Sequence, residues 1–73
     1  MKFVDVEVGD TVVVFDEYSH DYVEHEIKVT SIEYDKENIT DTNPNGKVCY
    51  GEDLTYDDDE HMITVVTESN FTR

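Results

Sequence analysis

The chain is poor in the residues that build helices or cross-link small domains. It has no Ala and no Gln, and its single Leu is Leu54, so strong helix formers are scarce. Cys49 is the only cysteine, which excludes an intrachain disulfide. The sequence shows no N-terminal export segment and no apolar run near the roughly 20 residues of a membrane span. We therefore expect a cytoplasmic protein, either in its own cell or in a host cell.

Basic residues are scarce as well. Five Lys and Arg stand against nineteen Asp and Glu, which gives a formal net charge of -14. The charge is spread along the chain, and the many valines and aromatic residues distinguish it from a disordered acidic segment. A folded acidic domain repels nucleic acids and anionic membranes and attracts basic surfaces. We expect a basic protein as partner, and no direct binding to DNA, RNA or a membrane.

β-Branched residues are abundant. Eleven Val, four Ile and eight Thr favour β-strands over helices. The chain of 73 residues is expected to form a single acidic domain, residues 1–73. A chain of this size buries only about 60% of the surface that its unfolded form exposes, so it has little room for a deep catalytic cleft.

Alternating apolar and polar residues predict several short strands. Residues 3–8 alternate valines with acids, and residues 12–15 are apolar at successive positions. Residues 23–34 form the longest alternating segment, with His25 on its inward face. The alternation shifts by one position at Thr30 and Ser31, which predicts a bulge or bend there.

The second half of the chain carries the strongest turn signal. Residues 43–46 read Asn-Pro-Asn-Gly, which predicts a hairpin. In the flanking strands we expect Ile39, Val48 and Tyr50 to face inward and Cys49 to face the opposite side. A last strand is expected within residues 62–69, followed by a turn that brings Phe71 against the core.

Five or six short strands with regular turns predict a small antiparallel β-barrel. The segment VEVGDTVVVF, residues 6–15, resembles the opening of SH3-like barrel modules, where a Val-Gly-Asp turn precedes the first long strand. The resemblance implies an all-β SH3-like barrel, with one strand bent near Thr30 and Ser31. It covers about ten residues and identifies no ligand-binding position.

Metal and catalytic sites find little support in the spacing of the residues. The acids at 57–60 are contiguous and lack the alternating oxygens and the glycine of a calcium loop. His20, His25, His61 and Cys49 show no paired zinc-ligand spacing. Cys49 with His61 lacks an orienting third group, so we expect no metal, no cofactor and no enzymatic activity. His25 itself is either a buried base or pH switch, or a partly buried histidine bonded to a neighbouring acid or to the backbone.

The five tyrosines have two interpretations. Tyr34 and Tyr50 fit the pattern of core residues that keep their hydroxyl groups in water. Tyr18, Tyr22 and Tyr56 lie in or beside the two most acidic loops. There they are either rim residues or rigid contact surface for a partner.

These observations favour a non-enzymatic acidic module that docks on a basic, nucleic-acid-binding protein and blocks it by imitating nucleic acid. In size and charge the chain is similar to small acidic inhibitors encoded by phages and mobile elements. The alternative is an SH3-like accessory module that recognises a basic peptide through a tyrosine-lined groove. We expect a monomer or weak dimer. The predicted partner-binding residues are Asp16, Glu17, Tyr18, Asp21, Tyr22, Glu24, Glu26, Glu52, Asp53, Tyr56, Asp57, Asp58, Asp59 and Glu60.

Overall fold

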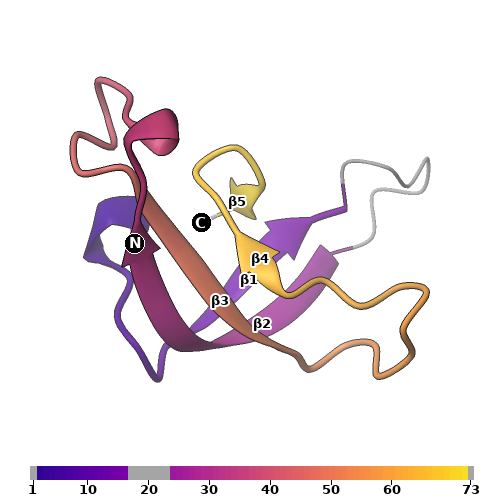
Figure 1. Ribbon diagram of the computed structural model, residues 1–73. Helices are drawn as coiled ribbons and strands as arrows, with labels where there is room; N and C mark the ends of the chain where they lie inside the picture. The colour runs from indigo at the N-terminus through magenta and orange to yellow at the C-terminus, as the bar shows by residue number, and fades with distance from the viewer. Residues whose placement is uncertain (1, 17–23, 73) are drawn as a thin grey trace.

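The computed structural model describes residues 2–16 and 24–72, which form one curled antiparallel sheet shaped like half a barrel (Figure 1). The elements in chain order are η1 (Phe3–Asp5), β1 (Thr11–Phe15), β2 (Glu24–Tyr34), η2 (Lys36–Asn38), β3 (Lys47–Asp53), β4 (Val65–Val66) and β5 (Phe71–Thr72). The strand order in the sheet is β4-β3-β2-β1-β5. Both η segments are single 3-10 turns, and the described residues contain no α-helix.

Strand β2 is the longest element and pairs with both β1 and β3. Its pairing with β3 shifts between Val29 and Ser31, so Thr30 is an extra residue in the ladder. The Thr30 hydroxyl donates a hydrogen bond to the Tyr50 carbonyl at 3.3 Å. This irregularity lies where the shift in alternation predicted it, and it accompanies the strong curvature of β2.

The core lies in the concave side of the curled sheet. Before the bulge, β2 buries alternate residues, beginning with His25, as the alternation predicted. Phe71 packs against the core from β5, with its ring centroid 5.6 Å from that of Phe3, which confirms its expected position. The buried apolar cluster consists of Phe3, Val6, Val12, Val14, Ile27, Val29, Cys49 and Val66.

The N-terminal segment is not the predicted strand. Residues 3–5 form a 3-10 turn, in which residues three apart lie on the same side. Phe3 and Val6 are therefore buried together, while Val4 and Val8 are exposed. The alternation of residues 3–8 was misleading because it is also compatible with this three-residue spacing.

The inward face of β3 differs from the prediction. Cys49 pairs with Ile32 and is fully buried in the core cluster, so Val48 and Tyr50 point to the other side of the sheet. Val48 is nevertheless buried, at 6% exposed, whereas Tyr50 is half-buried. Ile39 is 51% exposed and Tyr34 is 64% exposed, so neither is a core residue. The side that each residue faces depends on the pairing of β3 with the part of β2 beyond the bulge, and local alternation does not reveal that pairing.

The two flanking strands are joined by a tight turn. Strand β4 is shorter than the predicted strand within residues 62–69, and it is linked to β5 through residues 67–70. The Asn70 side chain accepts from the Thr67 N–H at 2.8 Å and donates to the Val65 carbonyl at 3.0 Å. The mostly-β antiparallel fold is confirmed. Two of the five strands, β4 and β5, are only two residues long, so the predicted set of five or six strands is not confirmed, and the SH3-like barrel stays a prediction.

Candidate functional site

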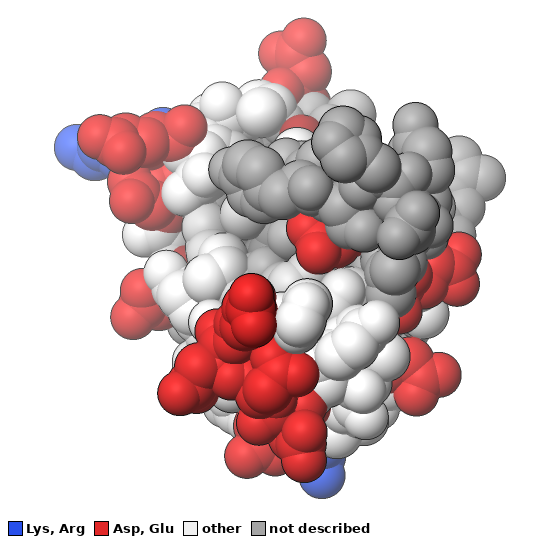
Figure 2. Space-filling view, turned by 90° about the vertical axis from the view of Figure 1, so that its right-hand side faces the viewer, with Lys and Arg blue, Asp and Glu red and all other residues white. Residues whose placement is uncertain are grey.

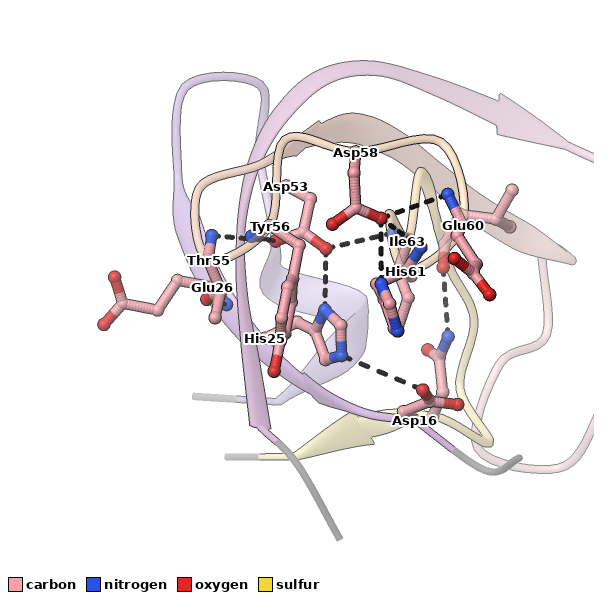
Figure 3. A network of polar contacts seen from close by, with 12 residues as sticks. Asp16, His25, Glu26, Asp53, Thr55, Tyr56, Asp58, Glu60, His61 and Ile63 are labelled. Atoms are coloured by element: carbon pink, nitrogen blue, oxygen red, sulfur yellow. Dashed lines mark hydrogen bonds and ion pairs between the residues drawn. The ribbon is translucent and has the colours of Figure 1, made fainter. Parts of the chain in front are cut away.

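A buried histidine-aspartate pair holds the long loop that follows β3 (Figure 3). The His25 side chain is 1% exposed and that of Asp53 is 0% exposed, with 2.6 Å between His25 Nδ1 and Asp53 Oδ2. The same carboxylate accepts hydrogen bonds from the backbone N–H groups of Thr55 at 2.8 Å, Tyr56 at 3.1 Å and Ile63 at 3.0 Å. Asp53 thereby fastens both ends of the loop to β2.

The hydrogen bonds around Asp53 control its ionisation. Burial by itself raises the pKa of Asp53, but hydrogen bonds from the Ile63 N–H, His25, and the Tyr56 and Thr55 N–H groups outweigh it, so the pKa is lowered. An ionised carboxylate can only accept hydrogen bonds, so Nδ1 of His25 carries the hydrogen and donates the hydrogen bond to Asp53. Asp53 was predicted to bind a partner, but the structure places its carboxylate inside the protein, where a partner does not reach it.

The other ring nitrogen of His25, Nε2, is buried and lacks a hydrogen bond among the described residues. The Asp16 carboxylate is 4.0 Å away, and the Tyr56 ring centroid is 4.9 Å from that of the imidazole. A carboxylate on Nδ1 and an open Nε2 are what a general base needs. Within the described chain, however, no hydroxyl or thiol is hydrogen-bonded to Nε2, so no nucleophile is positioned there.

A second histidine-aspartate pair shapes the exposed part of the loop. Asp58 Oδ1 is 2.9 Å from His61 Nδ1 and accepts from the backbone N–H groups of Glu60 at 3.1 Å and His61 at 2.8 Å. The hydrogen bond to Asp58 raises the pKa of His61, and the same contact lowers the pKa of Asp58. The His61 ring stacks on Tyr56 with 5.4 Å between centroids. The acidic loop, residues 57–60, is therefore an ordered turn.

The acids of this loop do not form a group of metal ligands. Across residues 2–16 and 24–72, no three histidine, cysteine or carboxylate side chains are grouped as metal ligands would be. Cys49 is buried in the core, where desolvation raises the pKa of its thiol. The His61 side chain is 55% exposed, so the structure does not bring Cys49 and His61 together as a nucleophile and a base.

The predicted binding residues on the strands lie on the outer face of the sheet. Glu24 and Glu26 are exposed and pair with Phe15 and Val13 of β1. Glu52 is also exposed. In Figure 3 the carboxylate of Glu26 points away from the loop that carries Asp58 and Glu60. The Glu26 carboxylate and the acidic loop thus face different directions.

The remaining predicted binding residues have different fates. Asp57, Asp58, Asp59 and Glu60 are all exposed. Tyr56 is half-buried between two histidine rings, so it supports the loop from beneath. Glu17, Tyr18, Asp21 and Tyr22 lie outside the described residues.

The exposed charge is predominantly negative, although Lys2, Lys28 and Lys36 are exposed. Lys47 is buried; its ammonium donates to the carbonyls of Val4, at 3.0 Å, and of Val6. Within the described chain, leaving Asp16 aside, no Asp or Glu forms a salt bridge with Lys or Arg. Figure 2 looks onto the side that carries the acidic loop and shows red carboxylates gathered there, with blue only at the margins. Sequence reasoning missed the burial of Lys47, because no local pattern marks it.

A separate hollow lies at the far end of β2 and β3. It has a volume of about 480 Å³. The hollow, called the tyrosine groove, is lined by Glu33, Tyr34, Asp35, Lys36, Asn38, Val48, Tyr50, Val65 and Thr67. Sequence reasoning had instead assigned a groove to Tyr18, Tyr22 and Tyr56. Of those three, only Tyr56 is described, and it does not line this hollow.

Comparison of the chain with protein-family models, with curated proteins and with solved structures found no match. In the described residues, no helix has the length and apolar character needed to cross a membrane. The function is therefore inferred from the surface and the sites described above.

Proposed function

We propose that this protein is a non-enzymatic acidic module that docks on a basic, nucleic-acid-binding surface of a partner protein and blocks it. The observation that carries the proposal is the lack of neutralisation: across residues 2–16 and 24–72, Asp16 apart, the carboxylates have no Lys or Arg partner, and Lys47 is buried. Charged surfaces of one sign steer oppositely charged partners and repel polyanions.

The acidic loop is suited to this role because it is ordered. Asp53 holds the ends of the loop, and Asp58 closes its turn through two backbone N–H groups. Asp57, Asp59 and Glu60 are then presented without a large entropic cost of ordering on binding. A basic surface that binds these carboxylates releases its own counterions and becomes unable to bind nucleic acid, so the interaction depends steeply on salt.

We also propose that the curled sheet is an SH3-like barrel. Two features support this: the bulged, curved β2, and the turn at residues 67–70 that connects the two flanking strands of the sheet. Because such a fold hosts many functions, it adds nothing to the choice of partner.

The proposal is tested by capture from a cell lysate with the tagged chain at about 50 mM and about 200 mM salt, followed by mass spectrometry. We expect nucleic-acid-binding proteins to be recovered at the lower salt and lost at the higher one. Recovery of proteins without a basic surface, unchanged by salt, would contradict the proposal.

A pair of variants with the same net charge makes the test specific. The first variant combines Asp57→Lys, Asp59→Lys and Glu60→Lys and leaves the structural Asp58 in place. The second combines Asp5→Lys, Glu7→Lys and Asp41→Lys, which are exposed. The segments that carry them, around residues 3–8 and 40–43, lie on the side of the molecule away from the acidic loop (Figure 1). Only the first should lose the captured proteins. Equal loss in both would show that the loop itself is not the docking surface.

A further inference from the structure

A buried polar nitrogen at the base of the loop that follows β3 has an unused bonding position. It is Nε2 of His25, whose side chain is 1% exposed and which makes no hydrogen bond within the described residues. The Asp16 carboxylate lies 4.0 Å from it, and Figure 3 shows the two groups directed toward each other. Because buried polar atoms are rarely left without a hydrogen bond in folded proteins, this pair calls for an explanation.

The protonation of the ring explains why the bond is missing. Nδ1 carries the hydrogen, since it donates to the Asp53 carboxylate at 2.6 Å. A neutral imidazole has a single N–H, so Nε2 then has a lone pair and faces the oxygens of Asp16 as one acceptor facing another. A proton added to Nε2 turns it into a donor. A shortening of the contact by about 1 Å then gives a charge-assisted hydrogen bond of ordinary length.

Three segments of the described chain bring titratable groups to the His25 ring. Asp16 follows β1, and Asp53 ends β3. Tyr56, in the loop after β3, packs on the imidazole with 4.9 Å between ring centroids and also stacks on His61. Burial opposes a charge on the imidazole, whereas the two carboxylates beside it favour one. A proton on Nε2 would place a positive charge between two acids.

We propose that His25 and Asp16 form a latch that closes when Nε2 takes up a proton. In the closed state the imidazolium donates to Asp53 from Nδ1 and to Asp16 from Nε2, so one side chain of β2 joins the end of β1 to the end of β3. Asp53 also accepts hydrogen bonds from the N–H groups at both ends of the loop, so the latch fixes the base of the loop. This goes beyond the proposed function, because it concerns control by pH and requires no partner.

A double-mutant cycle between positions 16 and 25 tests the latch. Asp16→Asn removes the charge that the imidazolium would meet. His25→Asn keeps an amide donor near Asp53 but places no atom where Nε2 lies. Urea denaturation gives the unfolding equilibrium constants at about pH 8 and about pH 5.5, within the range where histidine titrates. We expect the two positions to be coupled about tenfold at the acidic pH and less than about twofold at the higher pH.

The cycle also separates the latch from the other histidine of the loop. His61 titrates in the same range, but an effect of His61 that does not pass through both positions cancels in the cycle. The coupling therefore reports on the contact between His25 and Asp16 alone.

Nitrogen NMR of the imidazole ring follows the same proton and needs no variant at position 25. On acidification the Nε2 resonance should move to that of a protonated nitrogen, while Nδ1 keeps its hydrogen throughout. Asp16→Asn should require a more acidic solution for the same change. The control Asp41→Asn removes an equal, exposed charge in the segment 40–43, on the side of the molecule away from the acidic loop (Figure 1). It should leave the His25 resonances unchanged.

Three results would overturn the latch. The first is a coupling that is equal at both pH values or absent at the acidic one. The second is an Nε2 that stays unprotonated down to the pH at which the chain unfolds. The third is an equal effect of Asp16→Asn and Asp41→Asn on the ring, which would assign the effect to the overall field. Each of these results leaves the proposed docking through the acidic loop standing, since none involves a partner.

Discussion

At the scale of single residues, the least exposed charges are those that organise the structure. Asp53 accepts one side-chain and three backbone hydrogen bonds. Lys47 donates to two carbonyls near the N-terminus, and its ammonium lies 5.9 Å from the centre of the Phe3 ring. Each buried charge joins segments distant in the sequence. A buried charge is tolerated when its hydrogen bonds are satisfied in this way.

The variant Asp53→Asn tests this role. The amide Nδ2 would face the Ile63 N–H, which is a donor opposite a donor, so we expect a loss of about 2 kcal/mol in the free energy of unfolding. Urea denaturation measures it. The control Asp57→Asn changes an exposed acid and should stay within about 0.5 kcal/mol of the unmodified chain. Similar stability of the two variants would show that Asp53 does not anchor the loop.

The same variant gives a pH dependence with a defined sign. The pKa of Asp53 is lowered in the folded protein from its ordinary 3.8, so its stabilising contribution is present above that value. It is lost as the pH falls through the lower folded pKa. We therefore expect the stability difference between the unmodified chain and Asp53→Asn to shrink on acidification, measured by urea denaturation at a series of pH values. A difference that grows would contradict the lowered pKa.

His61 titrates in the opposite sense. Its pKa is raised from the ordinary 6.5 by Asp58, so the pair stabilises the loop below that value and the effect is lost as the pH rises through the folded pKa. An NMR titration of the His61 ring should show a midpoint above 6.5. Asp58→Asn should bring the midpoint back toward the ordinary value, while Asp57→Asn should leave it raised. Equal shifts in both variants would assign the effect to the overall field.

At the scale of elements, the sequence predicted the strand that has one buried face. It was misleading where the side that a residue faces depends on pairing with a distant segment. The alternation in β2 predicted both its buried face and the bulge at Thr30, because a strand with one buried face must preserve its alternation or break it visibly. Two predictions were wrong: that Cys49 faces away from the core, and that the N-terminal segment, which forms a 3-10 turn at residues 3–5, is a strand. Both depend on contacts with distant segments.

The candidate sites show the same division. The exposure of residues 57–60 was predictable, since contiguous acids are rarely buried. Asp53 was grouped with them because it is one more acid in an acidic stretch, and only the approach of β2 makes it internal. The exposure of Tyr34 and the placement of Tyr50 on the face away from Cys49 were missed because both tyrosines were assigned to the core from local alternation alone.

The bulge in β2 requires a small residue opposite it. A Cβ atom on Gly51 would lie 2.2 Å from the Lys28 carbonyl oxygen and 2.9 Å from Ile27 Cγ2. Because backbone must move, we expect Gly51→Ala to cost at least about 2 kcal/mol. In the comparison variant Gly9→Ala, nothing lies within 4 Å but φ is +98°, so we expect a cost of about 1 to 2 kcal/mol. Thermal melts compare them, and tolerance of Ala at position 51 would contradict the close pairing of β2 and β3.

At the scale of the whole molecule, the unneutralised charge opposes folding. Self-repulsion weakens as the screening length falls from about 30 Å at 0.01 M salt to about 3 Å at 1 M. We expect the melting temperature to rise with salt. The variant that carries Lys at 57, 59 and 60 should be more stable than the unmodified chain at low salt, and the difference should vanish at high salt. A difference that salt leaves unchanged would assign it to the local turn.

The acidic module is tested most directly by the affinity for one captured partner, measured across a salt series with and without competing duplex DNA. For a polyelectrolyte-like contact, we expect the logarithm of the binding constant to fall linearly with the logarithm of salt concentration. Duplex DNA should displace the module from the partner, and the variant with Lys at 57, 59 and 60 should bind far more weakly. An affinity that is independent of salt, unaffected by DNA and retained by that variant would contradict docking through the acidic surface.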